Sequence, residues 1–204
     1  MPRTAKVARS EMSGVKGNRA IVWTIVIYAA MVLAFTVISL RSSPPASQTG
    51  VLRTLNAIPG HLVYLAGFGV VLGLVGSAIY RRLDLNLIIL IPVLVVLTDL
   101  DHFPSALGMS QPVRPAHSLI FIIAVVATLA LLTRRPDVEA ATVSAFFAHL
   151  SVDTGVFSPF SPISFVYYNL SAYQPVMIVA AVVAALAAGY LGRRYDLERK
   201  KTPP

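Results

Sequence analysis

Long apolar runs alternate with short polar stretches along almost the whole chain. Six apolar segments can be marked, at residues 20–40, 61–80, 85–98, 118–133, 140–152 and 175–191. An α-helix needs about 20 residues to cross a hydrocarbon core of ~30 Å. The first, second and sixth segments are that long or nearly so. The pattern therefore predicts an all-α, polytopic membrane protein with about six transmembrane helices.

The third and fifth segments contain only 14 and 13 residues, and a helix rises only about 1.5 Å per residue. They can cross the membrane only if their helices continue through the polar residues that follow, which are Asp99 to His102 and Asp153. The acidic ends would then lie within the membrane thickness and face the interior of the bundle. The alternative is that both segments are re-entrant or interfacial.

Composition also indicates a membrane protein. Hydrophobic residues make up 56% of the 204 positions and charged residues only 13%, whereas a soluble domain has about 25% charged residues. The net charge of +8 does not indicate a nucleic-acid partner, because the cations cluster beside the apolar segments. The chain has no cysteine, which excludes disulfides and thiolate metal ligands.

The distribution of Lys and Arg predicts the orientation. All but three of the 17 stand before the first segment, between the second and third, between the fourth and fifth, or after the sixth; the exceptions are Arg41, Arg53 and Arg114. The positive-inside rule then predicts a multi-pass cell-membrane protein with both termini in the cytoplasm. The predicted parts are a basic tail at 1–19, a six-helix membrane domain at 20–192 and a second basic tail at 193–204.

The same topology gathers histidines and acids on the extracytoplasmic face. It places there all four histidines and three of the nine acidic residues: His61, Asp99, Asp101, His102, His117, His149 and Asp153. Because the topology rests on Lys and Arg alone, this co-location is an independent observation. Each of these residues lies at the end of an apolar run, and ionisable groups at membrane depth are costly enough to indicate a functional site.

Helical spacing places some of these residues on shared faces. His149 and Asp153 are four residues apart, and Asp99 and His102 are three apart. Residues at either spacing lie on one face of a helix, so each pair can bind a single ion. Asp101 points elsewhere on an ideal helix. It can serve a second ion, orient a ligand histidine, or join the site where the helix frays.

The remaining two histidines open apolar segments. His61 begins the second segment, and His117 directly precedes the fourth. Together with the two pairs, they bring four helix ends to one pocket, which is how metal sites are built inside helical bundles. The sequence therefore predicts a single site assembled from four distant parts of the chain.

Imidazole and carboxylate groups together suit a hydrolytic metal centre. Both are good ligands for zinc, manganese or iron, and a divalent cation offsets the cost of buried carboxylates. Such an ion lowers the pKa of a bound water towards about 7, which gives a nucleophile at neutral pH. An aspartate that does not bind the ion can act as general base. With seven candidate residues, two metals or one metal plus a base both fit.

Each candidate also has a simpler interpretation. His61 can be an interfacial residue, and His117 can merely precede a serine that caps a helix. The acidic segment after the third helix can lie in a solvated loop, and His149 with Asp153 can form a proton relay. The ordered combination favours a metal site over these separate explanations.

Two further features bear on the substrate. Arg114 is the only cation near these motifs, and it either binds an anionic substrate such as a phosphate or extends to the membrane interface. The connection at 154–174 is rich in aromatic residues. Such a connection indicates either an interfacial belt or a lid over the site.

Four short motifs resemble those of a known family. They are Thr98-Asp-Leu-Asp-His102, Arg114-Pro-Ala-His-Ser118, His149-Leu-Ser-Val-Asp153 and Ser158-Pro-Phe-Ser161. Their order and spacing are similar to those of the YdjM-like membrane-bound metal-dependent hydrolases. That family shows Pro-Asp-Ile-Asp-His, His-Arg…Thr-His-Ser and His-Leu-Leu-Leu-Asp segments, followed by Pro-Phe-Ser. This chain departs from the pattern at Thr98 and Ala116, and it lacks the histidine before the arginine.

The resemblance implies an integral membrane hydrolase. Carried over residue by residue, its metal ligands are Asp99, Asp101, His117, His149 and Asp153. The family's motif order is also similar to that of zinc-dependent phospholipase C and P1-type nucleases, which implies a phosphoester substrate, with a lipid as one form. The missing histidine implies that one ligand is absent or is replaced by His61 or His102.

We therefore predict a metal-dependent hydrolase that acts at the extracytoplasmic face on a membrane-associated substrate in the lipid bilayer. Zinc is the first expectation for the ion, with manganese or iron as alternatives, and His61 is a further expected ligand. Asp101 and His102 are the expected catalytic acid–base groups, and Arg114 is expected to bind substrate. The alternative functions are a proton- or metal-coupled transporter and a non-catalytic metal-binding membrane protein. The apolar cytoplasmic halves of the helices favour a site open to one side over a transport path.

Overall fold

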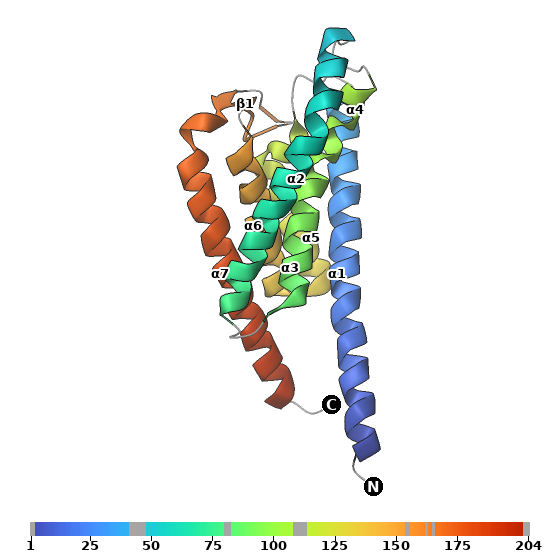
Figure 1. Cartoon of the computed structure of the whole chain (residues 1–204). Coiled ribbons are helices and arrows are strands. Elements are labelled where there is room, and N and C mark those ends of the chain that lie inside the picture. The colour runs from blue at the N-terminus through green and yellow to red at the C-terminus, as the bar shows by residue number, and fades with distance from the viewer. Residues whose placement is uncertain are drawn as a thin grey trace.

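The chain folds as a bundle of long helices that run roughly along one axis (Figure 1). The computed structural model describes residues 3–40, 48–79, 83–107, 114–153, 156–161, 163–164 and 166–201. The helices are α1 (Arg3–Leu40), α2 (Gln48–Ala78), α3 (Leu85–Leu97), α4 (Phe103–Ala106), α5 (Leu119–Thr133), α6 (Pro136–Val152) and α7 (Gln174–Lys201). Between them lie the 3₁₀ helices η1 (Thr98–His102), η2 (Pro115–His117) and η3 (Leu170–Ala172), and the paired strands β1 (Val156–Phe157) and β2 (Tyr168–Asn169). The side chains of residues 1–18, Arg41 and Arg53 lie outside the described residues.

The apolar helices identify a membrane protein. Among the described residues, four stretches are long and apolar enough to cross a bilayer: Arg19–Ile38, Gly60–Ala78, Leu85–His102 and Gln174–Glu198. The helices α5 and α6 are shorter, with 15 and 17 residues. The prediction of an all-α membrane protein is confirmed, and the number of six crossings stays a prediction.

The third apolar segment gains length at its C-terminal end. Its helix α3 starts after Asp84, whose side chain accepts a hydrogen bond from Asn86 N at 3.0 Å and so caps the helix. At the other end, η1 follows directly and extends the span to 18 residues. The expected continuation through the polar residues is therefore observed, in the tighter 3₁₀ form.

The fifth segment gains length at its N-terminal end instead. The helix α6 stops at Val152, and Asp153 caps it with extended backbone angles (φ −72°, ψ 134°). The expectation that this helix continues through Asp153 is therefore wrong. The helix begins early at Pro136, with Asp137 and Glu139 in its first turn. The fixed φ of proline and the acidic side chains near the positive helix end both favour a start there.

The second segment also differs from the expectation. The apolar pattern places the start of the second segment at residue 61, but α2 starts at Gln48 and includes residues 48–60 as well. His61 consequently lies inside a helix rather than at its start. Residues 51–58 are mostly of types that tolerate a helix, so the sequence permits the longer element; their side chains lie outside the described residues.

Helices at the two sides of the bundle enclose an apolar core. The long α1 packs against α3 and α5 at one side, and α7 packs against α2 and α6 at the other (Figure 1). Leu94, Phe121 and Phe146 are fully buried between these layers. The ring of Tyr28 meets that of Phe121 edge-on at a centroid distance of 5.4 Å, a favoured aromatic geometry.

Glycine residues let α2 and α7 approach closely. A Cβ atom built on Gly189 would lie 2.0 Å from the carbonyl oxygen of Gly76, and one built on Gly76 would lie 2.7 Å from the carbonyl oxygen of Ala185. The two backbones are therefore in direct contact. Small residues allow such contacts between membrane helices, where packing replaces the hydrophobic effect as the driving force.

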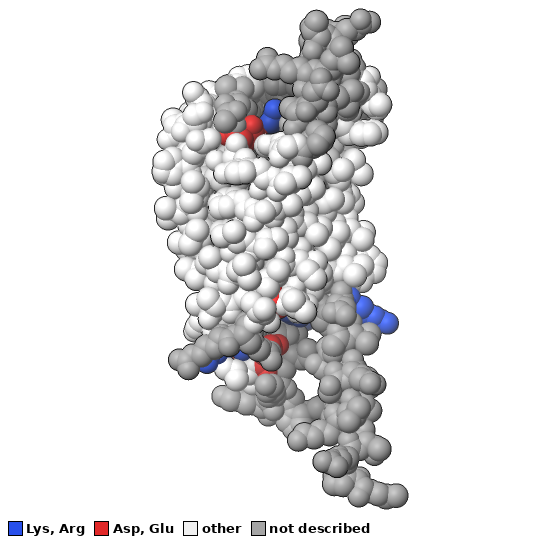
Figure 2. Space-filling model, in the orientation of Figure 1, with Lys and Arg blue, Asp and Glu red and all other residues white. Residues whose placement is uncertain are grey.

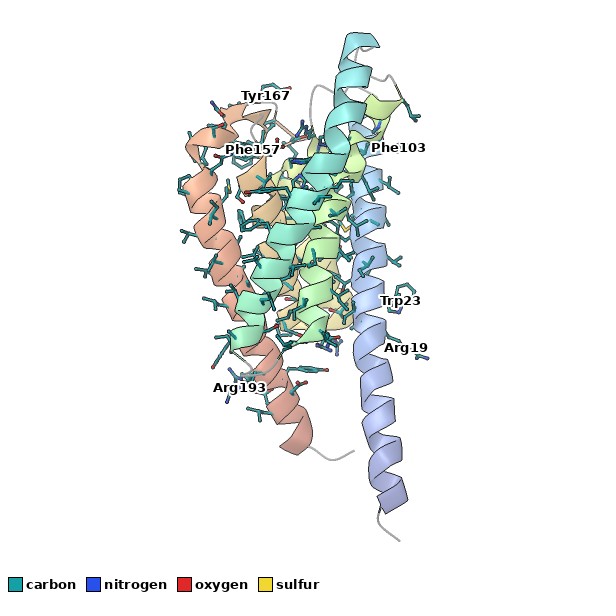
Figure 3. The ribbon with its side chains drawn as sticks, viewed as in Figure 1. Arg19, Trp23, Phe103, Phe157, Tyr167 and Arg193 are labelled. Atoms are coloured by element: carbon teal, nitrogen blue, oxygen red, sulfur yellow. The ribbon has the colours of Figure 1, made fainter. Side chains whose placement is uncertain are left out.

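The two ends of the molecule differ in their charged and aromatic residues. Both termini lie at the same end (Figure 1). Arg19 and Arg193 lie toward that end, whereas Phe103, Phe157 and Tyr167 lie at the other (Figure 3). On the face shown in Figure 2, the charged side chains gather at two levels, with a broad band free of charge between them. This band is the part of the surface suited to a bilayer.

We predict that Gly189→Ala destabilises the protein by about 1–3 kcal/mol, because the added methyl group overlaps the α2 backbone. The matched control is Gly67→Ala, since a Cβ atom at Gly67 meets nothing within 4 Å. Both changes bring the same gain in helix propensity, so thermal unfolding in one detergent isolates the steric effect. Equal melting temperatures would contradict the close contact.

Candidate metal centre

The structure brings all seven predicted histidines and aspartates together at the end of the bundle away from the termini. Four elements supply them: His61 comes from α2; Asp99, Asp101 and His102 from η1; His117 from η2; and His149 with Asp153 from the end of α6. In the 3₁₀ turn of η1, residues three apart lie on the same face, so Asp99 and His102 lie together while Asp101 lies on another face.

The two most buried histidines face each other through their Nε2 atoms. His117 Nε2 and His149 Nε2 lie 2.8 Å apart, and neither side chain is more than 1% exposed. The Nδ1 atom of His149 lies 2.9 Å from the carbonyl oxygen of Val95, and that of His117 lies 2.9 Å from Asp101 Oδ2. The contacts of the two Nδ1 atoms therefore fix the orientation of both rings.

These contacts determine whether each Nε2 atom carries a proton or a lone pair. The Val95 carbonyl only accepts hydrogen bonds, so His149 Nδ1 is the donor and its Nε2 carries a lone pair in the neutral ring. The Asp101 carboxylate imposes the same tautomer on a neutral His117. Two lone pairs at this separation repel unless a cation lies between them. The pair therefore requires either a proton or a metal ion.

A third ligand atom completes a metal-binding triad. Asp153 Oδ2 lies 3.3 Å from His117 Nε2, and one ligand atom from each of His117, His149 and Asp153 lies within 4.8 Å of the others. Two atoms that each bind zinc at ~2.0–2.1 Å with tetrahedral angles are about 3.3 Å apart. All three residues are buried. The donor set suits a divalent metal ion, and the His117–Asp153 spacing matches this separation, whereas the 2.8 Å between His117 Nε2 and His149 Nε2 is a metal-free, hydrogen-bonding distance that would widen on metal binding.

Electrostatics at this triad also favour a cation. Burial alone would lower the pKa of His117, but Asp101 and Asp153 outweigh it and raise that pKa to about 9. Burial alone would raise the pKa of Asp153, yet His117 and Arg114 hold it below its usual range. Without a metal, a proton occupies the site, and a metal ion must displace it.

Asp99 lies at the centre of the cluster, and its carboxylate can accept hydrogen bonds that the described residues do not supply. Its oxygens lie 3.6 Å from His61 Nε2, 3.3 Å from His102 Nε2 and 3.6 Å from His149 Nε2. Among the described residues, neither oxygen has a hydrogen-bond partner, and His102 Nε2 has none either. A buried carboxylate without partners is costly. Asp99 belongs to two further triads, one with His61 and His149 and one with His102 and His117.

Asp101 lies behind the histidines rather than among the ligand triads. It is fully buried, and its Oδ2 atom engages His117 Nδ1. Of the three roles that the sequence left open, this contact is the orienting one. Such a carboxylate holds the ring and increases the basicity of the ligand nitrogen. The sequence-based expectation of Asp101 as a direct ligand has no counterpart in these triads.

Arg114 contacts the site itself. Its Nη1 atom donates a hydrogen bond to Asp153 Oδ2, and its side chain is 36% exposed. Arg114 therefore lies at the rim of the site and contacts the carboxylate of Asp153. The contact with Asp153 is a role that neither alternative included, and the expectation that Arg114 binds an anionic substrate stays a prediction.

Several supporting groups were not anticipated from the sequence. Most are backbone atoms, which leave no sequence signal: the carbonyl of Val95 orients His149, and the carbonyl of Asp153 accepts a hydrogen bond from Gln174 Nε2 at 3.3 Å. The Tyr28 hydroxyl lies 2.7 Å from Thr98 Oγ1, directly before the acidic segment. Tyr28 lies in a uniformly apolar stretch, where a lone tyrosine is an ambiguous signal.

The aromatic connection is tied to the site. Pro159, in the Ser-Pro-Phe-Ser motif, accepts a hydrogen bond from Leu119 N at 2.8 Å through its carbonyl. Phe157 is buried and its ring is 6.2 Å from that of Tyr168, whereas Phe160 is 51% exposed. This connection therefore has an inner side next to the start of α5 and an outer aromatic side.

The chain was compared with family models, curated proteins and solved structures, and none matches it. The resemblance to the YdjM-like hydrolases consequently rests on the four short motifs alone.

We predict that Asp101→Asn weakens zinc binding by about 10–100-fold, because the amide accepts the His117 hydrogen bond without the carboxylate charge. The measurement is competition for zinc against a chelator, with the protein in detergent. Asp84→Asn is the matched control, since asparagine also caps helices and Asp84 lies at the start of α3. Unchanged affinity in Asp101→Asn would exclude the orienting role.

Proposed function

We propose that the chain is a membrane-embedded metal-dependent hydrolase whose substrate is a membrane-associated phosphoester. The observation that carries the proposal is the pair of buried nitrogens, His117 Nε2 and His149 Nε2, that face each other at 2.8 Å beside the Asp153 carboxylate. Two histidines and one carboxylate form a ligand set of hydrolytic zinc enzymes. Zinc is accordingly the first ion to test, followed by manganese and iron.

The proposed roles follow from the contacts of each residue. A bound ion supplies the positive charge that lowers the pKa of water and polarises a phosphoryl oxygen. Asp99, whose oxygens have no hydrogen-bond partner among the described residues, accepts the proton of the attacking water. His102 Nε2, 3.3 Å from Asp99 Oδ1, passes a proton to the leaving group. Asp101 orients His117, so the base role expected for Asp101 passes to Asp99.

Arg114 supports a phosphate rather than a neutral substrate. Its guanidinium lies at the rim beside Asp153, where a planar, permanently charged group can exchange one carboxylate contact for a phosphoryl oxygen. Removing Arg114 should therefore weaken substrate binding more than it changes the metal content.

The orientation is part of the same proposal. Six crossings, made by α1, α2, α3 with η1, α5, α6 and α7, would place both termini in the cytoplasm and the site outside. Arg19 and Arg193 at the end of the termini (Figure 3) support this orientation. Arg193 also donates to the Ile79 carbonyl at 3.2 Å, which ties the end of α7 to the end of α2.

A transport path receives less support than a one-sided site. A transporter needs polar groups along its whole route. Between the two charged levels, the core contains Leu94, Phe121 and Phe146. The buried Ser144 hydroxyl there donates to the Ala181 carbonyl at 2.8 Å, so it is used for helix packing.

The central test combines metal content with turnover. We expect wild type purified with zinc to contain at least one ion per chain by elemental mass spectrometry and to hydrolyse a member of a phosphoester panel. His149→Ala should lose both metal and activity. Asp99→Asn should keep metal while losing about 10²–10⁴-fold in rate, the usual contribution of a general base.

Glu139→Gln, at the other end of α6, is the control for a lost acidic side chain and should behave as wild type. Wild type that remains metal-free after purification with zinc, manganese and iron would overturn the hydrolase proposal. Metal-bound wild type without turnover across the panel would favour a non-catalytic metal-binding protein.

Because the chain has no cysteine, single cysteines can test the orientation. Tyr167 and Leu197 are both well exposed, at 46% and 50%, and lie toward opposite ends. A membrane-impermeant maleimide should label Tyr167→Cys in intact cells and Leu197→Cys only after permeabilisation. The reverse pattern would place the site in the cytoplasm.

A further inference from the structure

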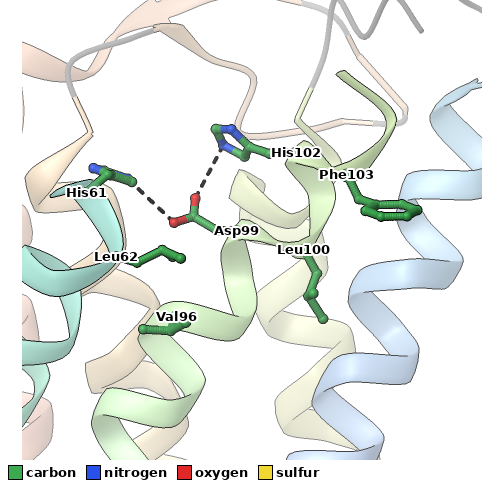
Figure 4. Close-up of a pocket in the computed structure, with 7 residues that line it drawn as sticks. All are labelled: His61, Leu62, Val96, Asp99, Leu100, His102 and Phe103. Atoms are coloured by element: carbon green, nitrogen blue, oxygen red, sulfur yellow. Dashed lines mark ion pairs between the residues drawn. The ribbon is translucent and has the colours of Figure 1, made fainter. Parts of the chain in front are cut away.

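An apolar pocket opens beside the metal-binding cluster (Figure 4). It has a volume of about 220 Å³ and is lined by His61, Leu62, Val96, Asp99, Leu100, His102 and Phe103. Its polar lining is confined to Asp99 and the two histidines that flank it. The other walls are side chains of leucine, valine and phenylalanine. The pocket thus joins a charged reaction site to an apolar compartment.

The pocket lies between helices at membrane level. Leu62 belongs to the span Gly60–Ala78, and Val96 and Leu100 belong to the span Leu85–His102. The side chain of Phe103, at the edge of the pocket next to α1 (Figure 4), is 58% exposed. The pocket is therefore lined by residues of two candidate membrane spans, α2 and the α3–η1 segment, with the exposed ring of Phe103 at its edge.

Asp99 connects this pocket to the proposed chemistry. Its two carboxylate oxygens have no hydrogen-bond partner among the described residues, although one lies 3.6 Å from His61 and the other 3.3 Å from His102. Asp99 is also close to His149 of the first triad, at 3.6 Å. A molecule that fills the apolar pocket therefore has its polar end at the metal-binding residues.

We propose that the pocket receives part of an acyl chain of a lipid whose anionic phosphate ester reaches the His/Asp cluster; this inference rests on the proposed hydrolase function. An apolar cavity of about 150 Å³ is enough to hold benzene, so this pocket accommodates several methylene groups but no bulky polar headgroup. Entry between these two spans would let the lipid reach the site without drawing its chains through water. A small soluble phosphoester would leave the apolar walls without a partner.

The test is photo-crosslinking of the full-length, zinc-loaded protein in phosphatidylcholine vesicles. The probe is a phosphatidic acid with a diazirine near the carboxyl end of one acyl chain. Mass spectrometry should find labelling several-fold higher on Leu62, Val96, Leu100 or Phe103 than on Val183, an exposed residue of α7 that serves as the internal reference for lipid contact. A diacylglycerol with the same label should show a smaller enrichment, because it lacks the anionic group.

Variants separate the pocket from the metal site. Val96→Trp should fill the pocket and abolish the enrichment while the zinc content stays at the wild-type level. Leu62→Phe is a milder change and should reduce the enrichment. Val179→Trp, at another exposed position of α7, is the matched control and should leave the enrichment unchanged. Zinc content also reports folding, so a variant that loses zinc is replaced in the comparison by the milder one.

The outcomes distinguish this inference from the function on which it rests. Zinc-loaded protein with labelling spread evenly over the lipid-facing helices would overturn the acyl pocket and leave the hydrolase proposal standing. Equal enrichment of phosphatidic acid and diacylglycerol would overturn the assignment of a phosphate headgroup. Protein that binds no metal and shows no enrichment would overturn both proposals.

Discussion

The structure depends on the free energy of holding carboxylates at the depth of a membrane. Three aspartate side chains lie inside the bundle, and each has nitrogen atoms of other side chains nearby. Asp101 Oδ2 pairs with His117 Nδ1 while its Oδ1 has no hydrogen-bond partner among the described residues, and Asp153 accepts a hydrogen bond from Arg114. Asp99 lies near imidazoles at 3.3–3.6 Å without a hydrogen bond among the described residues. Asp99 and Asp153, together with the imidazoles around them, are the groups that could hold a metal ion.

The position of the ligands depends on helix packing some distance away. His149 is carried by α6, which is fixed to α7 by the bond from Ser144 to the Ala181 carbonyl. In turn, α7 meets α2 at the contact of Gly189 with Gly76, and α2 carries His61. A shift of one helix would therefore move imidazoles on two sides of the cluster, because closely packed interiors transmit displacement rather than absorb it.

Local patterns in the sequence predicted the helices and the grouping of polar residues well, because hydrophobicity and charge act at the level of single residues. Helix ends were less predictable: α6 ends before Asp153, and α2 starts well before His61, since capping and tertiary contacts decide both. The support of His149 by the Val95 carbonyl could not be predicted, because every residue has a carbonyl group. The same holds for the contact of α2 with α7, since many glycines in membrane helices have no close neighbour.

The uncharged band between the two charged levels has an electrical consequence. The described acidic and basic side chains lie at the ends of the bundle, and the layer between them is filled by residues such as Leu94 and Phe121. Work against a transmembrane voltage requires that charge move across this layer. Protons and anions exchanged at the His/Asp cluster would enter and leave on one side of it. If the proposed hydrolase function and orientation hold, reactions at this end of the molecule would be uncoupled from the membrane potential.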